Sequence, residues 1–381
     1  MTAEDYMRIA IEEAKKGIGF TNPNPLVGAV LVKDNKIIGK DYHHRYGEAH
    51  AERNAILNCK EDLTGAAIYV TLEPCCHYGK TPPCTELIIK SGISEVYIGS
   101  YDNNPKVDGG GIRQLKEAGI KVTTEVLKEE CDALNPVFFH YIKHQEPYMV
   151  LKYAMTADGK IATHTGASKW ITGESARMRV QESRKYYSGI MVGIGTVLAD
   201  NPMLTCRMEN AKNPTRIICD SNLRIPMDSN IVQTASEVPT IIACTQSTKN
   251  NIENANEMNR QWEKKKQDLE NAGCEVLVLP AKDGKTDLKE LMRILGEKKI
   301  DSVLLEGGSE LNYSALCDGI VTKVESYIAP KLFGGKQAKT PIGGAGVDFP
   351  SEAFHLAKPK ITRLQEDILI EWEVVTCLPE L

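Results

Sequence analysis

The sequence predicts two α/β domains in one chain. Its 381 residues exceed the roughly 100–200 of one ordinary domain. Strand-like and helix-like segments alternate along both halves, and a polar segment of mixed pattern separates them at residues 125–145. We therefore expect one domain at residues 1–145 and a second at residues 146–381, with the boundary in a linker.

The first domain is predicted to begin with a helix, because Thr2 and Asp5 form a capping-box pattern and Gly17 ends its apolar face. Two strands joined by a tight turn follow it. The later elements alternate between helix and strand, which predicts a three-layer α/β/α domain. The strands are expected at residues 26–33, 36–40, 66–72, 95–100 and 120–124, and the helices at residues 50–58, 85–91 and 111–118.

The second domain is predicted to start with a strand at residues 148–155 and to continue as an α/β domain. The charged segment at residues 247–269 predicts an exposed helix, and the final alternating run at residues 368–375 predicts an antiparallel edge strand. Further strands are expected at residues 190–194, 216–219, 240–243, 275–279, 302–305 and 325–329, and helices at residues 174–187 and 287–296.

Composition argues against several classes of protein. A net charge of −5 gives no electrostatic footprint for a nucleic acid. No apolar stretch reaches the roughly 18 residues that span a bilayer, and the N-terminus lacks a signal-peptide pattern. The eleven scattered cysteines suit reduced thiols. We therefore expect a cytoplasmic protein with neither a nucleic-acid nor a membrane partner.

A histidine and two cysteines in the first half predict a catalytic zinc site. His50 starts a predicted helix, Cys75 follows a strand, and Cys84 precedes the next helix. Three ligands leave a fourth position for water, which zinc makes nucleophilic near neutral pH. Glu52 stands two residues after His50, where it is expected to carry a proton without binding the metal. This arrangement is typical of zinc-dependent nucleobase deaminases.

The spacing of the two cysteines departs from the commonest deaminase pattern. Eight residues separate Cys75 from Cys84, where the common form has two. A pair of buried free cysteines near a helix-start histidine is the alternative interpretation. The adjacent Cys76 is expected to point away from the metal and to pack against the fold.

The second half contains no G-x-G-x-x-G fingerprint, but two glycine turns stand out. Residues 193–196 carry a short glycine turn after a predicted strand, and residues 306–309 carry paired glycines between a strand and a helix. Backbone N–H groups and the helix dipole favour a phosphate at such a turn. A tight turn without a ligand remains the alternative for each.

Longer motifs in both halves resemble one known family. The runs T-N-P-N-P-L-V-G at 21–28, H-A-E at 50–52 and T-L-E-P-C-C-H-Y-G-K-T-P-P-C at 71–84 are similar to the deaminase domain of the bifunctional riboflavin-biosynthesis deaminase–reductases. The runs L-K-Y-A-M-T-A-D-G-K-I-A at 151–162, S-K-W-I-T at 168–172, G-I-G-T-V-L-A-D-N-P-M-L-T-C-R at 193–207 and E-G-G-S-E-L at 306–311 resemble its reductase domain. The resemblance covers nearly the whole chain.

The resemblance implies a cytidine-deaminase-like first domain with zinc and a dihydrofolate-reductase-like second domain with NADPH. The implied substrate is a diaminopyrimidinone that carries a ribosylamino 5′-phosphate. Its ring amine would be removed hydrolytically, and NADPH would then reduce the ribosyl group to ribityl. A homo-oligomer through the reductase domain is also implied. No proton donor is assigned to the reduction.

The resemblance also implies which residues contact the ligands. Lys80 suits the phosphate of the deaminase substrate, and Arg184 and Arg207 suit that of the reductase substrate, because cationic donors match phosphate oxygens. The implied deaminase contacts are Asn24, His43, His77, Lys80 and Asn104. The implied NADPH contacts are Ala154, Trp170, Thr196, Asp200, Ser221, Gly308, Ser309, Glu310, Leu311, Asn312, Tyr313 and Ser314. The implied contacts with the reductase substrate are Lys152, Ser168, Arg184, Leu204, Arg207 and Glu306.

Two positions depart from the pattern of the family. Asn103 stands where a proline is usual, and Gly110 stands where a basic residue is usual. If that basic residue helps to hold the phosphate, binding in this chain is expected to rely more on Lys80.

Two other classes of function remain as alternatives. A nucleic-acid deaminase fused to a nucleotide-binding module is opposed by the net charge and would show salt-dependent binding to tRNA. A zinc-stabilised scaffold without activity would need a fourth protein ligand and would unfold when zinc is removed.

Overall fold

The computed structural model describes residues 1–79, 82–104, 107, 109–246 and 255–375. The chain forms two compact units, Met1–Gln145 and Glu146–Leu381. Each unit has a sheet and an apolar core of its own.

The first unit is built around a five-stranded sheet of order β2-β1-β3-β4-β5. Strand β1 pairs antiparallel with β2 and β3, whereas β3, β4 and β5 are parallel. The strands are β1 (Gly28–Lys33), β2 (Lys36–Tyr42), β3 (Ala67–Leu72), β4 (Glu95–Ser100) and β5 (Lys121–Thr123).

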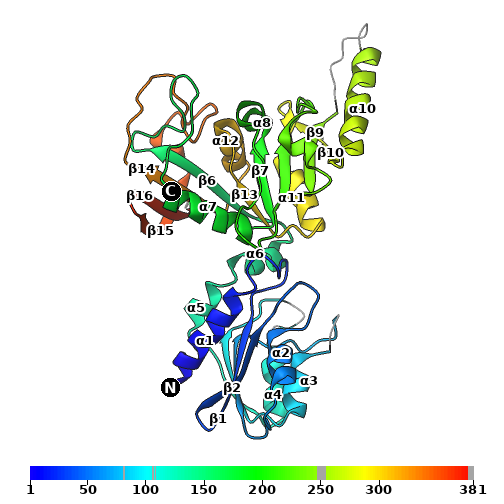
Figure 1. The fold of residues 1–381 in the computed structure, drawn as a ribbon, viewed down its shortest axis with the longest axis vertical. Coiled ribbons are helices and arrows are strands. Elements are labelled where there is room, and N and C mark those ends of the chain that lie inside the picture. Colours follow the sequence, from blue (N-terminus) through cyan, green and yellow to red (C-terminus); the bar gives the residue numbers. More distant parts are fainter. Residues whose placement is uncertain (80–81, 105–106, 108, 247–254, 376–381) are drawn as a thin grey trace. The chain divides into compact units, whose positions relative to one another are not determined.

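Helices cover both faces of this sheet, which confirms the predicted three layers. Figure 1 shows α1 and α5 on one side of the sheet and α2, α3 and α4 on the other. The predicted capping box of the first helix is present, because the Thr2 hydroxyl accepts from the Asp5 N–H and the Asp5 carboxylate accepts from the Thr2 N–H. The helices are α1 (Ala3–Lys15), α2 (Ala51–Asn58), α3 (Cys84–Lys90), α4 (Gly110–Glu117), α5 (Lys128–Asp132) and α6 (Pro136–His144).

The second unit contains a mixed nine-stranded sheet of order β10-β9-β8-β7-β13-β6-β14-β16-β15. The run from β10 to β14 is parallel, and β16 and β15 extend it antiparallel. The strands of this sheet are β6 (Tyr148–Thr156), β7 (Gly189–Gly193), β8 (Thr215–Cys219), β9 (Thr240–Thr245), β10 (Glu275–Leu279), β13 (Ser302–Leu305), β14 (Lys323–Ala329), β15 (His355–Leu364) and β16 (Asp367–Val375). A separate small hairpin joins β11 (Ala281–Lys282) and β12 (Lys285–Thr286).

Helices also bury both faces of the parallel part of this second sheet. Successive residues of β7 alternate between two cores: Met191 packs in the core that includes α11 and α12, and Ile190 and Val192 pack in the core that includes α8 and α9. The helices are α7 (Glu174–Tyr186), α8 (Ile194–Asp200), α9 (Asn230–Gln233), α10 (Ala255–Asn271), α11 (Leu288–Glu297) and α12 (Ser309–Cys317), with a short 3₁₀ turn at Pro350–Glu352.

Three expectations from the sequence need correction. Residues 125–145 hold α5 and α6 where we expected a linker, because Pro136 is the first residue of a helix. Strand β16 is antiparallel as expected, but β15 forms the edge of the sheet. The glycine turn expected at residues 193–196 is absent, since α8 begins at Ile194 directly after β7. Of the helix expected at residues 247–269, the part at 247–254 lies outside the described residues.

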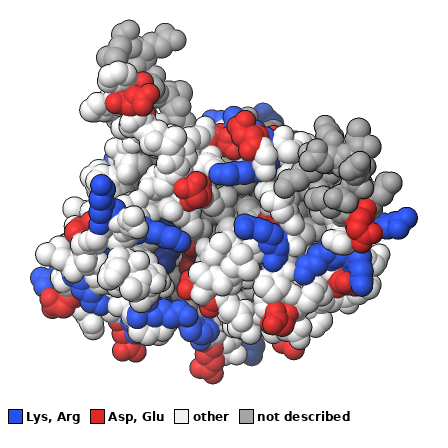
Figure 2. Space-filling model, turned by 90° about the horizontal axis from the view of Figure 1, so that it is seen from above, with Lys and Arg blue, Asp and Glu red and all other residues white. Residues whose placement is uncertain are grey.

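Charge is mixed on the face of the molecule seen in Figure 2. On this face, Lys and Arg side chains lie among Asp and Glu side chains, with no large area of one sign.

In the described parts of the chain, no helix combines the length and the apolar character that crossing a membrane requires.

Candidate functional site

Three predicted ligands meet at one point of the first unit. His50 is the N-cap of α2, Cys84 is the first residue of α3, and Cys75 lies in the loop after β3. The Nδ1 atom of His50 is 3.4 Å from the Sγ of Cys75 and 3.5 Å from the Sγ of Cys84. Because two helix N-termini and a strand end converge here, residues far apart in sequence form one cluster.

The geometry of this cluster fits a zinc ion. Zinc bonds of about 2.3 Å to sulfur and about 2.0 Å to nitrogen, at a tetrahedral angle, separate those ligand atoms by about 3.6 Å. The three ligand atoms lie within 4.8 Å of one another, and among the described residues no other His, Cys, Asp or Glu joins the group. Three protein ligands leave one position for a water or a substrate, as in a catalytic site.

Glu52 lies in the first turn of α2 and is 3 % exposed. Burial raises the pKa of Glu52 to about 7. Its carboxyl group is close enough to Cys84 and His50 to interact with both. A carboxyl group that is adjacent to the cluster but outside the ligand set is suited to hold a proton there.

The loop that carries Cys75 is fixed to α4 by a residue that the sequence did not single out. The buried carboxylate of Glu73 accepts the N–H groups of Gly109, at 3.3 Å, and Ile112, at 3.1 Å. A Cβ at Gly111 would lie 2.1 Å from the carbonyl oxygen of Pro74. The helix start and the ligand loop therefore pack backbone against backbone, which only glycine permits.

Gly110 also belongs to this close packing. A Cβ at position 110 would lie 2.8 Å from the Sγ of Cys76. Gly110, which stands where the family usually has a basic residue, thus leaves room for the side chain of Cys76.

Asn24 and His43 lie together beside the zinc cluster. His43 is 2 % exposed, and its ring meets that of His50 edge-on at 5.5 Å. Its Nδ1 is 2.9 Å from the carbonyl oxygen of Ala49, so Nδ1 carries the hydrogen. The Nε2 atom is then an acceptor for the amide of Asn24, at 3.1 Å. Burial lowers the pKa of His43, which favours this neutral form.

The remaining predicted deaminase contacts lie in two loops near the cluster. The Nδ1 of His77 is buried with no hydrogen-bond partner among the described residues. The backbone of Asn104 donates to the carboxylate of Asp102 at 2.9 Å, and burial raises the pKa of that carboxyl group to about 6. Lys80 lies outside the described residues.

In the second unit, predicted cofactor residues line the carboxyl edge of neighbouring parallel strands. Thr196 follows β7, Ser221 follows β8, and Gly308 follows β13. A Cβ at Gly308 would lie 3.6 Å from the hydroxyl oxygen of Thr196. Ala154 lies near the end of β6, the next strand. Open α/β sheets bind ligands at this edge, where the order of the strands reverses.

The start of α12 suits a phosphate group of NADPH. Gly308 has a φ of +84° and precedes the N-terminus of α12, where backbone N–H groups are free of helical partners. Asn312 is 3 % exposed, and its Oδ1 has no hydrogen-bond partner among the described residues. These features fit a bound cofactor at this edge.

Several other members of the predicted cofactor set contact groups of the protein itself. The Tyr313 hydroxyl donates to the carbonyl oxygen of Gly346, and the Glu310 carboxylate accepts the N–H of Gly344. Trp170 is 59 % exposed and lies under the guanidinium of Arg177. Of the remaining members, Leu311 is next to Gly193, Asp200 is exposed at the end of α8, Ser309 begins α12, and Ser314 lies on the same helix.

A buried charge cluster forms the centre of the predicted reductase substrate site. Arg184 donates through Nε and Nη2 to the two oxygens of Glu306, at 2.7 and 3.0 Å, and through Nη1 to the carbonyl oxygen of Thr205. The ammonium of Lys152 lies 3.9 Å from Glu306. Burial raises the pKa of Glu306, but Arg184 and Lys152 outweigh it and lower the value to about 2.

Arg207 is exposed next to this cluster. Its guanidinium forms no hydrogen bond or ion pair with a described residue, whereas that of Arg184 is largely committed to Glu306 and Thr205. Leu204, 4 % exposed, anchors the preceding turn in the core. Ser168 is half-buried in the segment after β6.

Comparisons with known proteins match both units. The model of the cytidine and deoxycytidylate deaminase zinc-binding region matches residues 1–100, and the model of the RibD C-terminal domain matches residues 147–370. The riboflavin biosynthesis protein RibD of Actinobacillus pleuropneumoniae is 56 % identical over 378 residues, which are 99 % of this chain and 97 % of that protein. RibD of Bacillus amyloliquefaciens is 44 % identical over 96 % of this chain and 94 % of its own length.

A solved structure agrees with these matches. The diaminohydroxyphosphoribosylaminopyrimidine deaminase/5-amino-6-(5-phosphoribosylamino)uracil reductase of Thermotoga maritima superposes with a TM-score of 0.82 at 38 % identity, over 98 % of this chain and 99 % of that one. The predicted fold class, with a cytidine-deaminase-like first half and a reductase second half, is confirmed. The chain therefore belongs to the RibD family of bifunctional riboflavin-biosynthesis enzymes, which join a zinc-dependent deaminase to an NADPH-dependent reductase.

Proposed function

We propose that this chain catalyses two consecutive reactions on a diaminopyrimidinone that carries a ribosylamino 5′-phosphate. Residues 1–145 remove the ring amine by hydrolysis, and residues 146–381 reduce the ribosyl group to ribityl. The observation that carries the proposal is the cluster of His50, Cys75 and Cys84 with buried Glu52 beside it. It occurs in a chain whose second half matches the RibD C-terminal domain.

In the first unit, each residue has a distinct role. His50, Cys75 and Cys84 hold the zinc, which when bound lowers the pKa of a water molecule and so supplies a nucleophile. The Glu52 carboxylate accepts a proton from the nucleophile and delivers it to the departing nitrogen. The carbon–nitrogen bond breaks, a carbon–oxygen bond forms, and ammonia leaves.

The other deaminase residues hold the substrate. Neutral His43 and the amide of Asn24 form a rigid hydrogen-bonded pair beside the metal ligands, suited to orient the ring. His77 and Asn104 border the same site, and Lys80 supplies the charge for the phosphate. Asp102 fixes the backbone of Asn104.

In the second unit, NADPH when bound supplies the hydride. The N–H groups at the start of α12 and the residues after β7 and β8 hold the cofactor at the carboxyl edge of the sheet. Glu306, Arg184 and Lys152 form the floor of the substrate site, and Arg207 receives the phosphate. These side chains orient the ribosyl group and exclude water from it.

We further propose that the chain forms a homo-oligomer through its second unit in the cytoplasm. Ile361 and Ile368 lie on one face of the antiparallel strands β15 and β16 and are 67 % and 42 % exposed, which supports contact with a second copy. The ten cysteines among the described residues form no disulfide, which suits a reducing compartment. Light scattering on purified protein tests the oligomer: a monomer mass would contradict it.

The proposed reactions are tested with zinc-loaded protein, NADPH and the diaminopyrimidinone ribosyl phosphate. We expect ammonia release followed by loss of NADPH absorbance. If the protein releases no ammonia from this compound, the deaminase proposal is wrong. If ammonia appears but NADPH is not consumed, the reductase proposal is wrong.

A further inference from the structure

The segment Thr205–Arg207 is held against α7 although it is neither helix nor strand. Arg184 donates to the carbonyl oxygen of Thr205 at 3.0 Å. The thiol of Cys206 is 3.4 Å from the carbonyl oxygen of Gln181. The side-chain oxygen of Gln181 accepts the backbone N–H of Arg207 at 2.8 Å. Three consecutive residues are therefore fixed by one helix.

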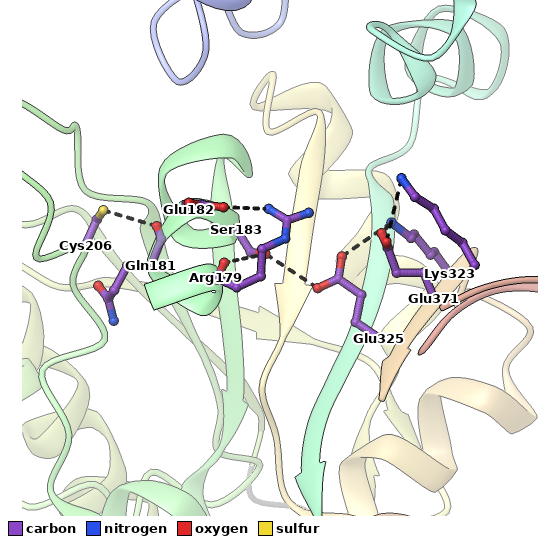
Figure 3. A network of polar contacts seen from close by, with 9 residues as sticks. Arg179, Gln181, Glu182, Ser183, Cys206, Lys323, Glu325 and Glu371 are labelled. Carbon is purple, nitrogen blue, oxygen red and sulfur yellow. Dashed lines mark hydrogen bonds and ion pairs between the residues drawn. The ribbon is translucent and has the colours of Figure 1, made fainter. Parts of the chain in front are cut away.

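Of these three contacts, the one made by the Gln181 side chain binds the backbone of Arg207 itself. Gln181 is 7 % exposed, so its amide oxygen needs a partner within the protein. Figure 3 shows the Gln181–Cys206 contact on one side of α7 and the Ser183–Glu325 contact on the other. The Gln181 side chain and its backbone carbonyl group therefore both bind this segment.

This bond fixes the backbone position from which the Arg207 side chain extends. The guanidinium of Arg207 is exposed and lies near enough to Glu306 to lower the pKa of that carboxylate. No described residue binds this guanidinium, so the position of the Arg207 backbone sets the region that its flexible side chain can reach. A segment that is free to shift would enlarge this region and raise the entropic cost of placing the charge on a phosphate.

We infer that Gln181 is a positioning residue that holds Arg207 over the phosphate of the reductase substrate. This inference rests on the reductase function proposed above. Gln181 itself is proposed to touch neither substrate nor cofactor. It acts by fixing the N–H of Arg207, and its effect therefore depends on the phosphate being present.

The test replaces Gln181 by methionine, which has a similar size but no acceptor oxygen. We expect the KM for the phosphorylated reductase substrate to rise about fivefold to tenfold, the loss expected for one hydrogen bond. The kcat and the KM for NADPH should stay within about twofold of wild type. Gln181→Ala removes the acceptor in a second way, and Gln181→Glu, which keeps an acceptor oxygen, should restore the KM.

Two comparisons separate positioning from a structural role. With the same compound lacking its phosphate, Gln181→Met and wild type should have equal KM. In an Arg207→Ala background, Gln181→Met should cause no further rise. Ser183→Ala, a buried change on the other side of α7, should leave every KM at the wild-type value.

The outcomes distinguish this inference from the function on which it rests. If wild type does not oxidise NADPH with the deaminated substrate, the reductase function is wrong. If wild type is active and the KM of Gln181→Met is unchanged, the inference is overturned. A KM that rises equally with and without the phosphate, or rises in the Arg207→Ala background, also overturns it.

Discussion

At the scale of single residues, the first site consists of three metal ligands and one buried carboxyl group beside them. His50, Glu52, Cys75 and Cys84 were expected in one site, and the structure brings all four together. Spacing along a sequence predicts such a cluster because each ligand stands at the end of a regular element.

Pairings between distant residues were not predictable. Arg184 and Glu306 were both expected to contact substrate, but they bind each other across 122 positions. Glu73 was not singled out, because its partners are backbone N–H groups at the start of α4, which no side-chain pattern reveals. A sequence pattern shows residue types, whereas these bonds depend on which elements pack together.

The Arg184–Glu306 pair predicts how stability depends on pH. The pKa of Glu306 falls from 4.5 to about 2 on folding, so its ionised form stabilises the fold above pH 4.5 and this contribution is lost as the pH falls toward 2. Between about pH 6 and about pH 4, wild type should lose roughly 1 kcal/mol more than Glu306→Gln. Urea unfolding of both proteins at each pH measures the difference. Equal losses would show that this carboxylate is not stabilised by its cations.

At the scale of elements, regular segments were predictable and irregular ones were not. The central strands β6, β7 and β13 are buried on both faces, and their apolar runs identified them. Strand β15 is an edge strand with a bulge between Ala357 and Lys360, and Pro359 interrupts its pattern. Helix α6 was taken as a linker because its first residue, Pro136, also marks turns.

The contact between α4 and the ligand loop gives a prediction for one helix. Gly111→Ala places a Cβ 2.1 Å from the carbonyl oxygen of Pro74, so the helix start must move away from the loop. We expect a loss of about 2 kcal/mol in the stability of the first unit and a lower zinc content. Thermal unfolding and metal analysis measure both.

Gly79→Ala is the matched control for this helix. Gly79 lies in the loop that carries Cys75, but a Cβ at position 79 would meet no described heavy atom within 4 Å. The control should keep the stability and the zinc content of wild type. If Gly111→Ala behaves like Gly79→Ala, the close packing of α4 on the loop does not support the metal site.

At the scale of the whole molecule, each unit has its own sheet and its own core. The apolar cluster of the first unit is formed by residues of its strands and helices, such as Val70, Ile88 and Ile98, and it includes none of the three metal ligands. A metal is therefore expected to serve chemistry more than folding in this unit. The units are separate in sequence, and each reaction is assigned to one of them.

Removal of zinc should therefore silence one activity without unfolding the chain. After chelation, ammonia release should stop, whereas far-UV circular dichroism and NADPH oxidation with the deaminated substrate should persist. Addition of zinc should restore ammonia release. Loss of secondary structure on chelation would instead support the structural role of zinc that a scaffold requires.

Two separate sites are proposed to act in a fixed order, and one variant tests this order directly. Glu52→Gln is given NADPH and either the diaminopyrimidinone ribosyl phosphate or its deaminated product. We predict a fall in ammonia release of at least about 100-fold and no NADPH oxidation with the first compound, but wild-type NADPH oxidation with the second. Ammonia release at the wild-type rate, or NADPH oxidation with the first compound, would contradict the account.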